Sequence, residues 1–182
     1  MASIKEISIV LVGNWNTKIF TPSWMIGELL TLSENEELNM GFNNNNLQLI
    51  YKYKNVHFIP TERVFEIKLV EISEEAISIA NKAVLKLITK LPYTPNLLVG
   101  FNYSVIDDLS VTNVSVPKFS ASYELNEIHF FKEEQNFVLN VILNCKDKNS
   151  VNYNFHYSNL NFITENVVEE HLAYLEKSWE QI

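Results

Sequence analysis

Apolar and polar residues alternate with a period of two along most of the chain, which is typical of β-strands with one buried face. Within Arg63–Ile72, for instance, the alternation places Glu66 and Lys68 opposite an apolar face. Ile4–Val12 is apolar on both faces, which predicts a central strand covered on both sides. The remaining predicted strands are Leu38–Phe42, Leu47–Tyr53, Val56–Ile59, Leu97–Val105, Leu109–Val116, Ser120–Phe131, Phe137–Cys145 and Val151–Tyr157.

Three segments carry the signals of helices. A capping serine followed by two glutamates predicts that a long helix begins at Ser73, and Pro92 ends it. An apolar stripe along Glu165–Trp179 predicts a closing helix. Thr21, with proline after it, predicts a shorter helix that reaches about Leu32.

The order of these elements favours an α+β fold, with a largely antiparallel sheet or sheets and about three helices. No linker rich in Pro, Gly or Ser interrupts the chain, so we expect a single domain over residues 1–182. Gly41–Pro60 and Gly100–Pro117 share a Gly-Phe-Asn triplet, an Asn-Val pair and a closing proline. A diverged internal duplication is one interpretation of that similarity.

Composition removes several classes of partner. The 182 residues carry a formal net charge of −8, and Arg63 is the only arginine, so we expect no nucleic-acid partner. The acidic charge also argues against binding to an anionic membrane. The chain has neither a signal-peptide pattern nor an apolar segment long enough to span a bilayer, which predicts a cytoplasmic protein. Its 23 asparagines suggest an AT-rich bacterial or phage genome.

The motifs of common cofactor sites are absent from the sequence. It has no GxSxG, GxxxxGK[ST] or GxGxxG motif, so we expect no nucleotide cofactor. Cys145, the single cysteine, is expected to be a buried structural thiol, and Asp107 and Asp108 an exposed turn. We expect no metal, because no HxH or HExxH pair occurs among His57, His129, His156 and His171. A metal site assembled from residues distant in the sequence stays open.

Two predicted hairpins bring polar residues together. A three-residue loop at Asp147–Asn149 matches the apolar faces of its flanking strands and pairs Leu139 with Tyr157. The preceding hairpin would pair Phe130 with Phe137. On the opposite face, these registers predict one row across three strands: Glu127, Asn140 and His156.

Such a row could orient His156 for proton transfer, which makes its three residues candidate catalytic residues. The alternative, which we favour, is a solvated sheet face of the kind that antiparallel sheets commonly show.

Two helical features are expected to lie in solvent. His171 follows two glutamates, which reads as an exposed face. Lys82, Lys86 and Lys90 recur every four residues near the end of their helix, where cations are favourable. Contact with an acidic partner is the alternative for this lysine line.

These observations favour a non-enzymatic protein–protein interaction or assembly protein, oligomeric or part of a larger prokaryotic complex. Its expected partners are a second copy of itself or another protein. Trp15 and Trp24 are the candidate interface anchors, and the alternative is that both close the end of the core. Two further functions stay open: a small apolar-ligand-binding protein, and a hydrolase or isomerase that uses His156.

One segment resembles a known group of proteins. Leu91–Pro95 reads Leu-Pro-Tyr-Thr-Pro and is followed by Gly100, Asn102 and Tyr103. This run resembles a leucine-proline-x-threonine-proline segment, then glycine-x-asparagine and an aromatic residue, in a family of uncharacterised bacterial proteins. The resemblance implies no activity.

Overall fold

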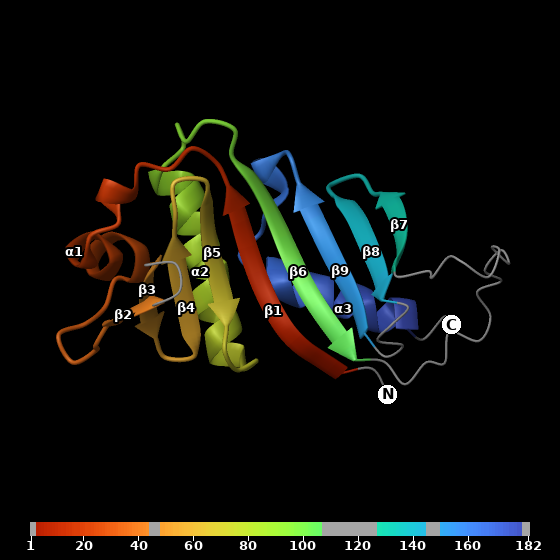
Figure 1. The fold of residues 1–182 in the computed structure, drawn as a ribbon, viewed down its shortest axis with the longest axis horizontal. Helices are drawn as coiled ribbons and strands as arrows, with labels where there is room; N and C mark the ends of the chain where they lie inside the picture. The colour runs from red at the N-terminus through yellow and green to blue at the C-terminus, as the bar shows by residue number, and fades with distance from the viewer. Residues whose placement is uncertain (1–2, 44–47, 107–126, 145–149, 180–182) are drawn as a thin grey trace, which may run out of the picture.

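Nine strands form one antiparallel sheet in the computed structural model, which describes residues 3–43, 48–106, 127–144 and 150–179 (Figure 1). The strand order is β2-β3-β4-β5-β1-β6-β9-β8-β7. The strands are β1 (Ser3–Val12), β2 (Asn39–Asn43), β3 (Gln48–Tyr53), β4 (Val56–Pro60), β5 (Val64–Leu69), β6 (Leu98–Ile106), β7 (Glu127–Glu133), β8 (Val138–Asn144) and β9 (Ser150–Tyr157). The helices are α1 (Pro22–Trp24), α2 (Glu74–Lys90), α3 (Val167–Trp179), the π-helix η2 (Met25–Leu30), and the 3-10 turns η1 (Thr17–Ile19) and η3 (Leu160–Phe162).

The predicted α+β class is confirmed, and both long helices lie on the same face of the sheet (Figure 1). Strand β1 is central, as predicted, between β5 and β6. The prediction that β1 is covered on both faces is wrong, because among the described elements the long helices cover one face, and Val12 on the other is 42% exposed. None of the described helices is long and apolar enough to cross a membrane.

The core lies between the sheet and the two long helices. Alternate residues of the central strands point into it, as their period of two predicts. Helix α2 contributes small residues, which allow it to approach the sheet closely. Fully buried core residues include Ile7, Ile9, Leu11, Phe65, Ile67, Val99, Phe101, Phe155, Ala80, Val84, Leu87, Val167, Val168 and Leu175.

Helices α1 and α2 each begin at the capping residue that the sequence predicts. The Ser73 hydroxyl accepts a hydrogen bond from the backbone N–H of Ala76 at 3.3 Å, and Thr21 caps α1 in the same way. The short helix then departs from the prediction, because it widens into the π-helix η2 at Met25. Met25 and Leu29 are its buried residues. It ends where Thr31 adopts a left-handed conformation, with φ of 51°.

The topology repeats across the centre of the sheet. In each half, a central strand (β1 or β6) pairs with the last strand of a later meander (β5 or β9), and a long helix follows. The two halves meet where β1 pairs with β6. The similarity noted around Gly41 and Gly100 does not follow this repeat, because Gly41 lies on edge strand β2 and Gly100 on central strand β6.

Candidate functional site

A surface hollow of about 330 Å³ lies between the end of η2, the β3–β4 turn and α2; we call it the η2–α2 hollow. It is formed by segments far apart in the sequence, and its wall carries two carboxylates and three lysines. Its polar lining includes Thr31, Glu36, Lys54, Glu75, Lys82 and Lys86.

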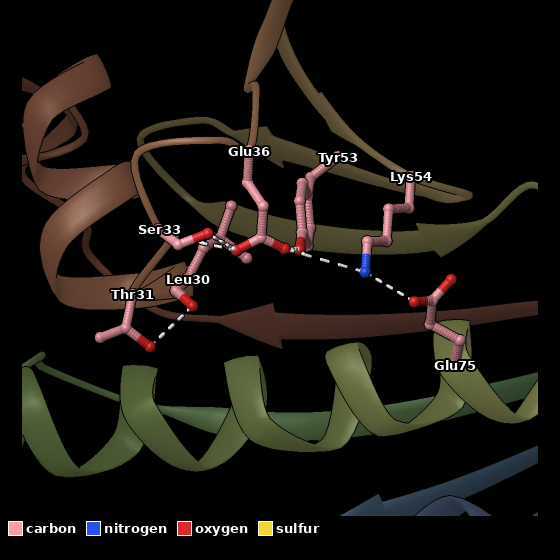
Figure 2. Close-up of polar contacts among 7 residues, drawn as sticks. All are labelled: Leu30, Thr31, Ser33, Glu36, Tyr53, Lys54 and Glu75. Atoms are coloured by element: carbon pink, nitrogen blue, oxygen red, sulfur yellow. Dashed lines mark hydrogen bonds and ion pairs between the residues drawn. The ribbon is translucent and has the colours of Figure 1, made fainter.

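Glu36 is the best-bonded carboxylate of the hollow (Figure 2). The Tyr53 hydroxyl donates to its Oε1 atom. The backbone N–H of Ser33 donates to Oε2 at 3.0 Å, and the Ser33 hydroxyl does so at 2.9 Å. The Tyr53 bond, followed by the two Ser33 bonds, lowers the pKa of Glu36 to about 2. Glu36 is therefore an ionised, fixed group and is unsuited to act as a general acid or base near neutral pH.

Lys54 joins the two carboxylates of the hollow. Its Nζ atom lies 2.6 Å from Oε1 of Glu75 and 3.9 Å from Oε1 of Glu36 (Figure 2). Hydrogen bonding to Glu75 is the main reason that the pKa of Lys54 is raised. Both carboxylates are thus engaged at the Lys54 end of the hollow.

Two residues with left-handed backbone conformations flank the hollow. Thr31 has φ of 51° and Lys54 has φ of 49°, which side chains other than glycine rarely adopt. The Thr31 hydroxyl donates to the carbonyl of Leu30 at 2.7 Å and accepts from Nζ of Lys86 at 2.9 Å. Such conformations, like π-helices, cluster at functional sites, which marks this hollow as the candidate site.

Replacing Glu36 with glutamine is expected to lower the melting temperature at pH 7, because the amide cannot accept all the bonds from Tyr53 and Ser33. A carboxylate whose pKa falls from 4.5 to about 2 on folding stabilises the protein above pH 4.5, and loses that effect as pH falls toward 2. The gap between wild type and Glu36→Gln should therefore shrink over that range in thermal melts.

Glu37→Gln is the matched control, since it removes the same charge from an exposed glutamate one residue further along the chain. An equal loss in both variants would contradict the role given to Glu36.

The network combines one local signal with several distant contacts. Ser33 and Glu36 have the spacing of a capping box, in which the carboxylate reaches back to the serine N–H, so the sequence held a signal for this pair. Tyr53, Lys54 and Glu75 come from other elements, and no spacing in the sequence places them here.

The predicted row of Glu127, Asn140 and His156 does not form. Asn140 pairs with Asn154, and Glu127 pairs with Asn144. His156 lies between Gly100 and Val138 in the register. The enzyme hypothesis loses the geometry on which it was based.

The row fails because both hairpin registers differ from the prediction. Leu139 pairs with Phe155 rather than Tyr157, a shift of two residues. Phe130 pairs with Val141 rather than Phe137, because the turn is formed further along and closes where the N–H of Glu134 donates to the carbonyl of Phe137 at 2.9 Å. Both shifts are even, so the predicted faces are unchanged.

Glu127 has a histidine partner on its own strand. His129 Nε2 lies 3.2 Å from Oε2 of Glu127, and both side chains are about half exposed. The pair lies on the side of β7 away from α3, on an edge strand in contact with solvent. This is the solvated sheet face of the alternative interpretation.

The two tryptophans lie at the end of the core. Trp15 is 6% exposed, and its indole N–H donates to the carbonyl of Leu11 at 3.1 Å. It therefore closes the core, as in the alternative interpretation. The prediction that Trp15 anchors an interface is wrong, because its ring is buried against Phe20 and Phe65. Trp24 is half-buried against Phe20, and its interface role stays a prediction.

The expectation that His171 is exposed is wrong. Its side chain is 2% exposed and lies on the buried side of α3, between two tyrosine hydroxyls. Among the lysine line, Lys86 is half-buried, and Lys90 pairs with Glu28 at 2.7 Å. Cys145, the Asp107–Asp108 pair, the strand predicted at Leu109–Val116 and the loop Asp147–Asn149 lie outside the described residues.

The segment Leu91–Pro95 lines a second hollow, of about 300 Å³. Trp15, Phe20 and Tyr93 contribute aromatic surface to it, and Tyr93 is 94% exposed. The apolar-ligand alternative stays a prediction, and this hollow is where it would apply.

Comparison of the chain with models of protein families and with curated proteins finds no match. Across residues 3–43, 48–106, 127–144 and 150–179, no group of three His, Cys, Asp or Glu side chains could hold a metal ion.

Proposed function

We propose that the protein is a non-enzymatic assembly protein that pairs with a second copy of itself through edge strand β2. The observation that carries the proposal is the chemistry of this edge. Its five residues include no charge and no proline, and Met40 and Phe42 are 56% and 68% exposed. Natural edge strands usually carry charges or prolines that prevent pairing with another chain.

The opposite edge, β7, has such protection. It carries Glu127, Lys132 and Glu133, all exposed, along seven residues. A second sheet that approached this edge would meet charges of both signs. The contrast between the two edges of one sheet supports β2 as the pairing edge.

The sequence of β2 favours a second copy as the partner. It reads Asn-Met-Gly-Phe-Asn and is nearly symmetric about Gly41. In a twofold antiparallel pairing centred on Gly41, Met40 of each copy faces Phe42 of the other. Met40 and Phe42 share the helix side of the sheet, because their partners on β3 are Tyr51 and Leu49. The contact would bury four exposed apolar side chains and include two sulfur–aromatic pairs.

Phe42→Lys is expected to convert a dimer into a monomer, since it places a charge at the centre of the apolar contact. The matched control is Phe131→Lys on β7, where the phenylalanine is 72% exposed. Sedimentation equilibrium and native mass spectrometry would measure the mass, with circular dichroism to verify the fold.

Each copy carries a net charge of −8, so the wild-type dimer should also become tighter as salt screens the repulsion. A monomeric wild type at all concentrations, or a dimer lost in Phe131→Lys but kept in Phe42→Lys, would overturn the proposal.

A further inference from the structure

We propose that the η2–α2 hollow binds a small organic phosphate, with its phosphate group held by Lys82 and Lys86. This inference is independent of pairing through β2. It rests on two lysines of the hollow that form no ion pair among the described residues, on the size of the hollow and on its backbone geometry.

The carboxylates of the hollow are used by groups other than these two lysines. Glu36 is bonded by Tyr53 and Ser33, and Glu75 by Lys54. Among the described residues, neither Lys82 nor Lys86 forms an ion pair, although both line the hollow. Lys86 gives one hydrogen bond to Thr31, and an ammonium group has three donors, so it retains donors for a ligand.

The positions of these groups favour a doubly charged anion. Lys82 and Lys86 lie one helical turn apart on the same face of α2. Burial is the main reason that the pKa of Lys86 is lowered, and the charges of Lys90 and Lys82 lower it further. Ser78 adds a hydroxyl group to the lining of the hollow, whereas the Thr31 hydroxyl already donates to Leu30 and accepts from Lys86. A phosphate group offers more acceptor oxygens and more charge than a carboxylate, which matches two ammonium groups with a hydroxyl beside them.

The remaining surface of the hollow fits a compact organic group. Leu30, Leu32 and Ile79 line it beside the polar groups. A volume of about 330 Å³ is near the lower end of the range of small-molecule sites. Thr31 and Lys54, both with left-handed backbone conformations, line this hollow as well.

Phenyl phosphate is the probe, titrated into isotope-labelled protein at constant ionic strength with the amide spectrum as readout. We expect shifts centred on Thr31, Ser78 and Lys86, with inorganic phosphate binding more weakly at the same residues. Phenol lacks the phosphate group, and benzoate carries a carboxylate in its place. Each should bind at least about tenfold more weakly than phenyl phosphate.

Lys82→Gln and Lys86→Gln should each weaken phenyl phosphate binding about tenfold. Lys90→Gln is the matched control, because Lys90 belongs to the same line but is paired with Glu28, and binding should stay within about twofold of wild type. Equal loss in all three variants would reveal general attraction to a basic helix face and overturn the site.

Absence of shifts in the hollow, or benzoate binding as tightly as phenyl phosphate, would also overturn the assignment. The monomeric Phe42→Lys variant should bind phenyl phosphate as wild type does, so failure of this inference and failure of the proposed function are distinguishable.

Discussion

Acidification from pH 7 to pH 4.5 is expected to lower the free energy of unfolding by about 3 kcal/mol through His171, since each unit of pKa difference corresponds to about 1.4 kcal/mol. Burial lowers the pKa of His171 from 6.5 to about 3 in the folded protein. The folded state therefore keeps the ring neutral over this range, while the unfolded chain takes up a proton below pH 6.5. The contribution of the neutral His171 ring to stability is complete above pH 6.5 and is lost progressively as pH falls toward 3.

The surroundings of His171 explain why the neutral ring is favoured. Nδ1 lies 2.8 Å from the Tyr103 hydroxyl and Nε2 lies 2.7 Å from the Tyr157 hydroxyl, so the neutral imidazole donates to one oxygen and accepts from the other. Phe155 stacks on the ring with centroids 3.9 Å apart. None of these three side chains supplies a negative charge to balance a protonated ring buried in the core.

Urea unfolding at the two pH values would measure the effect, with His171→Phe as the test variant. That variant is expected to be less stable than wild type at pH 7, because the tyrosine hydroxyls lose their partner. It should lose about 3 kcal/mol less than wild type between pH 7 and pH 4.5. Glu36 contributes little to the difference, since its effect is lost only below pH 4.5.

His129→Gln is the control, because it removes one histidine from the exposed edge strand β7 instead of from the core. Identical losses in wild type and His171→Phe would contradict the assignment of acid sensitivity to His171.

The sequence allowed the described strands and their helix-facing sides to be predicted, but not how the strands align. Alternation defines which side of β8 faces the helices, and any even shift of register preserves it. The true pairing of Leu139 with Phe155 is therefore as compatible with the pattern as the predicted pairing with Tyr157. A row such as Glu127, Asn140 and His156 depends on the alignment itself, so it was beyond the reach of periodicity.

The burial of His171 was readable from helical spacing. Val168, His171 and Leu175 recur at intervals of three and four residues, which places the histidine on the apolar stripe of α3. The adjacent glutamates suggested exposure, but sequence neighbours on a helix point in different directions. The η2–α2 hollow carried no comparable signal, because its charged groups come from elements that meet only in the folded chain.

Asn81→Ala is expected to lower the free energy of unfolding by about 3 kcal/mol. The variant loses a hydrogen bond to a charged group and leaves a buried N–H without a partner, and each of these costs is of this order. Asn81 lies on α2 and is 1% exposed. Its Nδ2 atom donates to Oε2 of Glu169 at 2.6 Å, and its Oδ1 atom accepts from the backbone N–H of Val168 at 3.3 Å. One side chain of α2 thus satisfies the first turn of α3, where helical N–H groups lack partners.

A reciprocal exchange separates this contact from simple loss of packing. Asn81→Asp keeps the acceptor for Val168 but sets two carboxylates against each other, so it should destabilise the protein at pH 7. Adding Glu169→Gln restores a donor–acceptor pair and should recover much of the loss, which a double-mutant cycle in urea would quantify. If the double variant were no more stable than Asn81→Asp alone, the bond would not dock α3. Recovery would show that this polar contact from α2 helps to hold α3 in place.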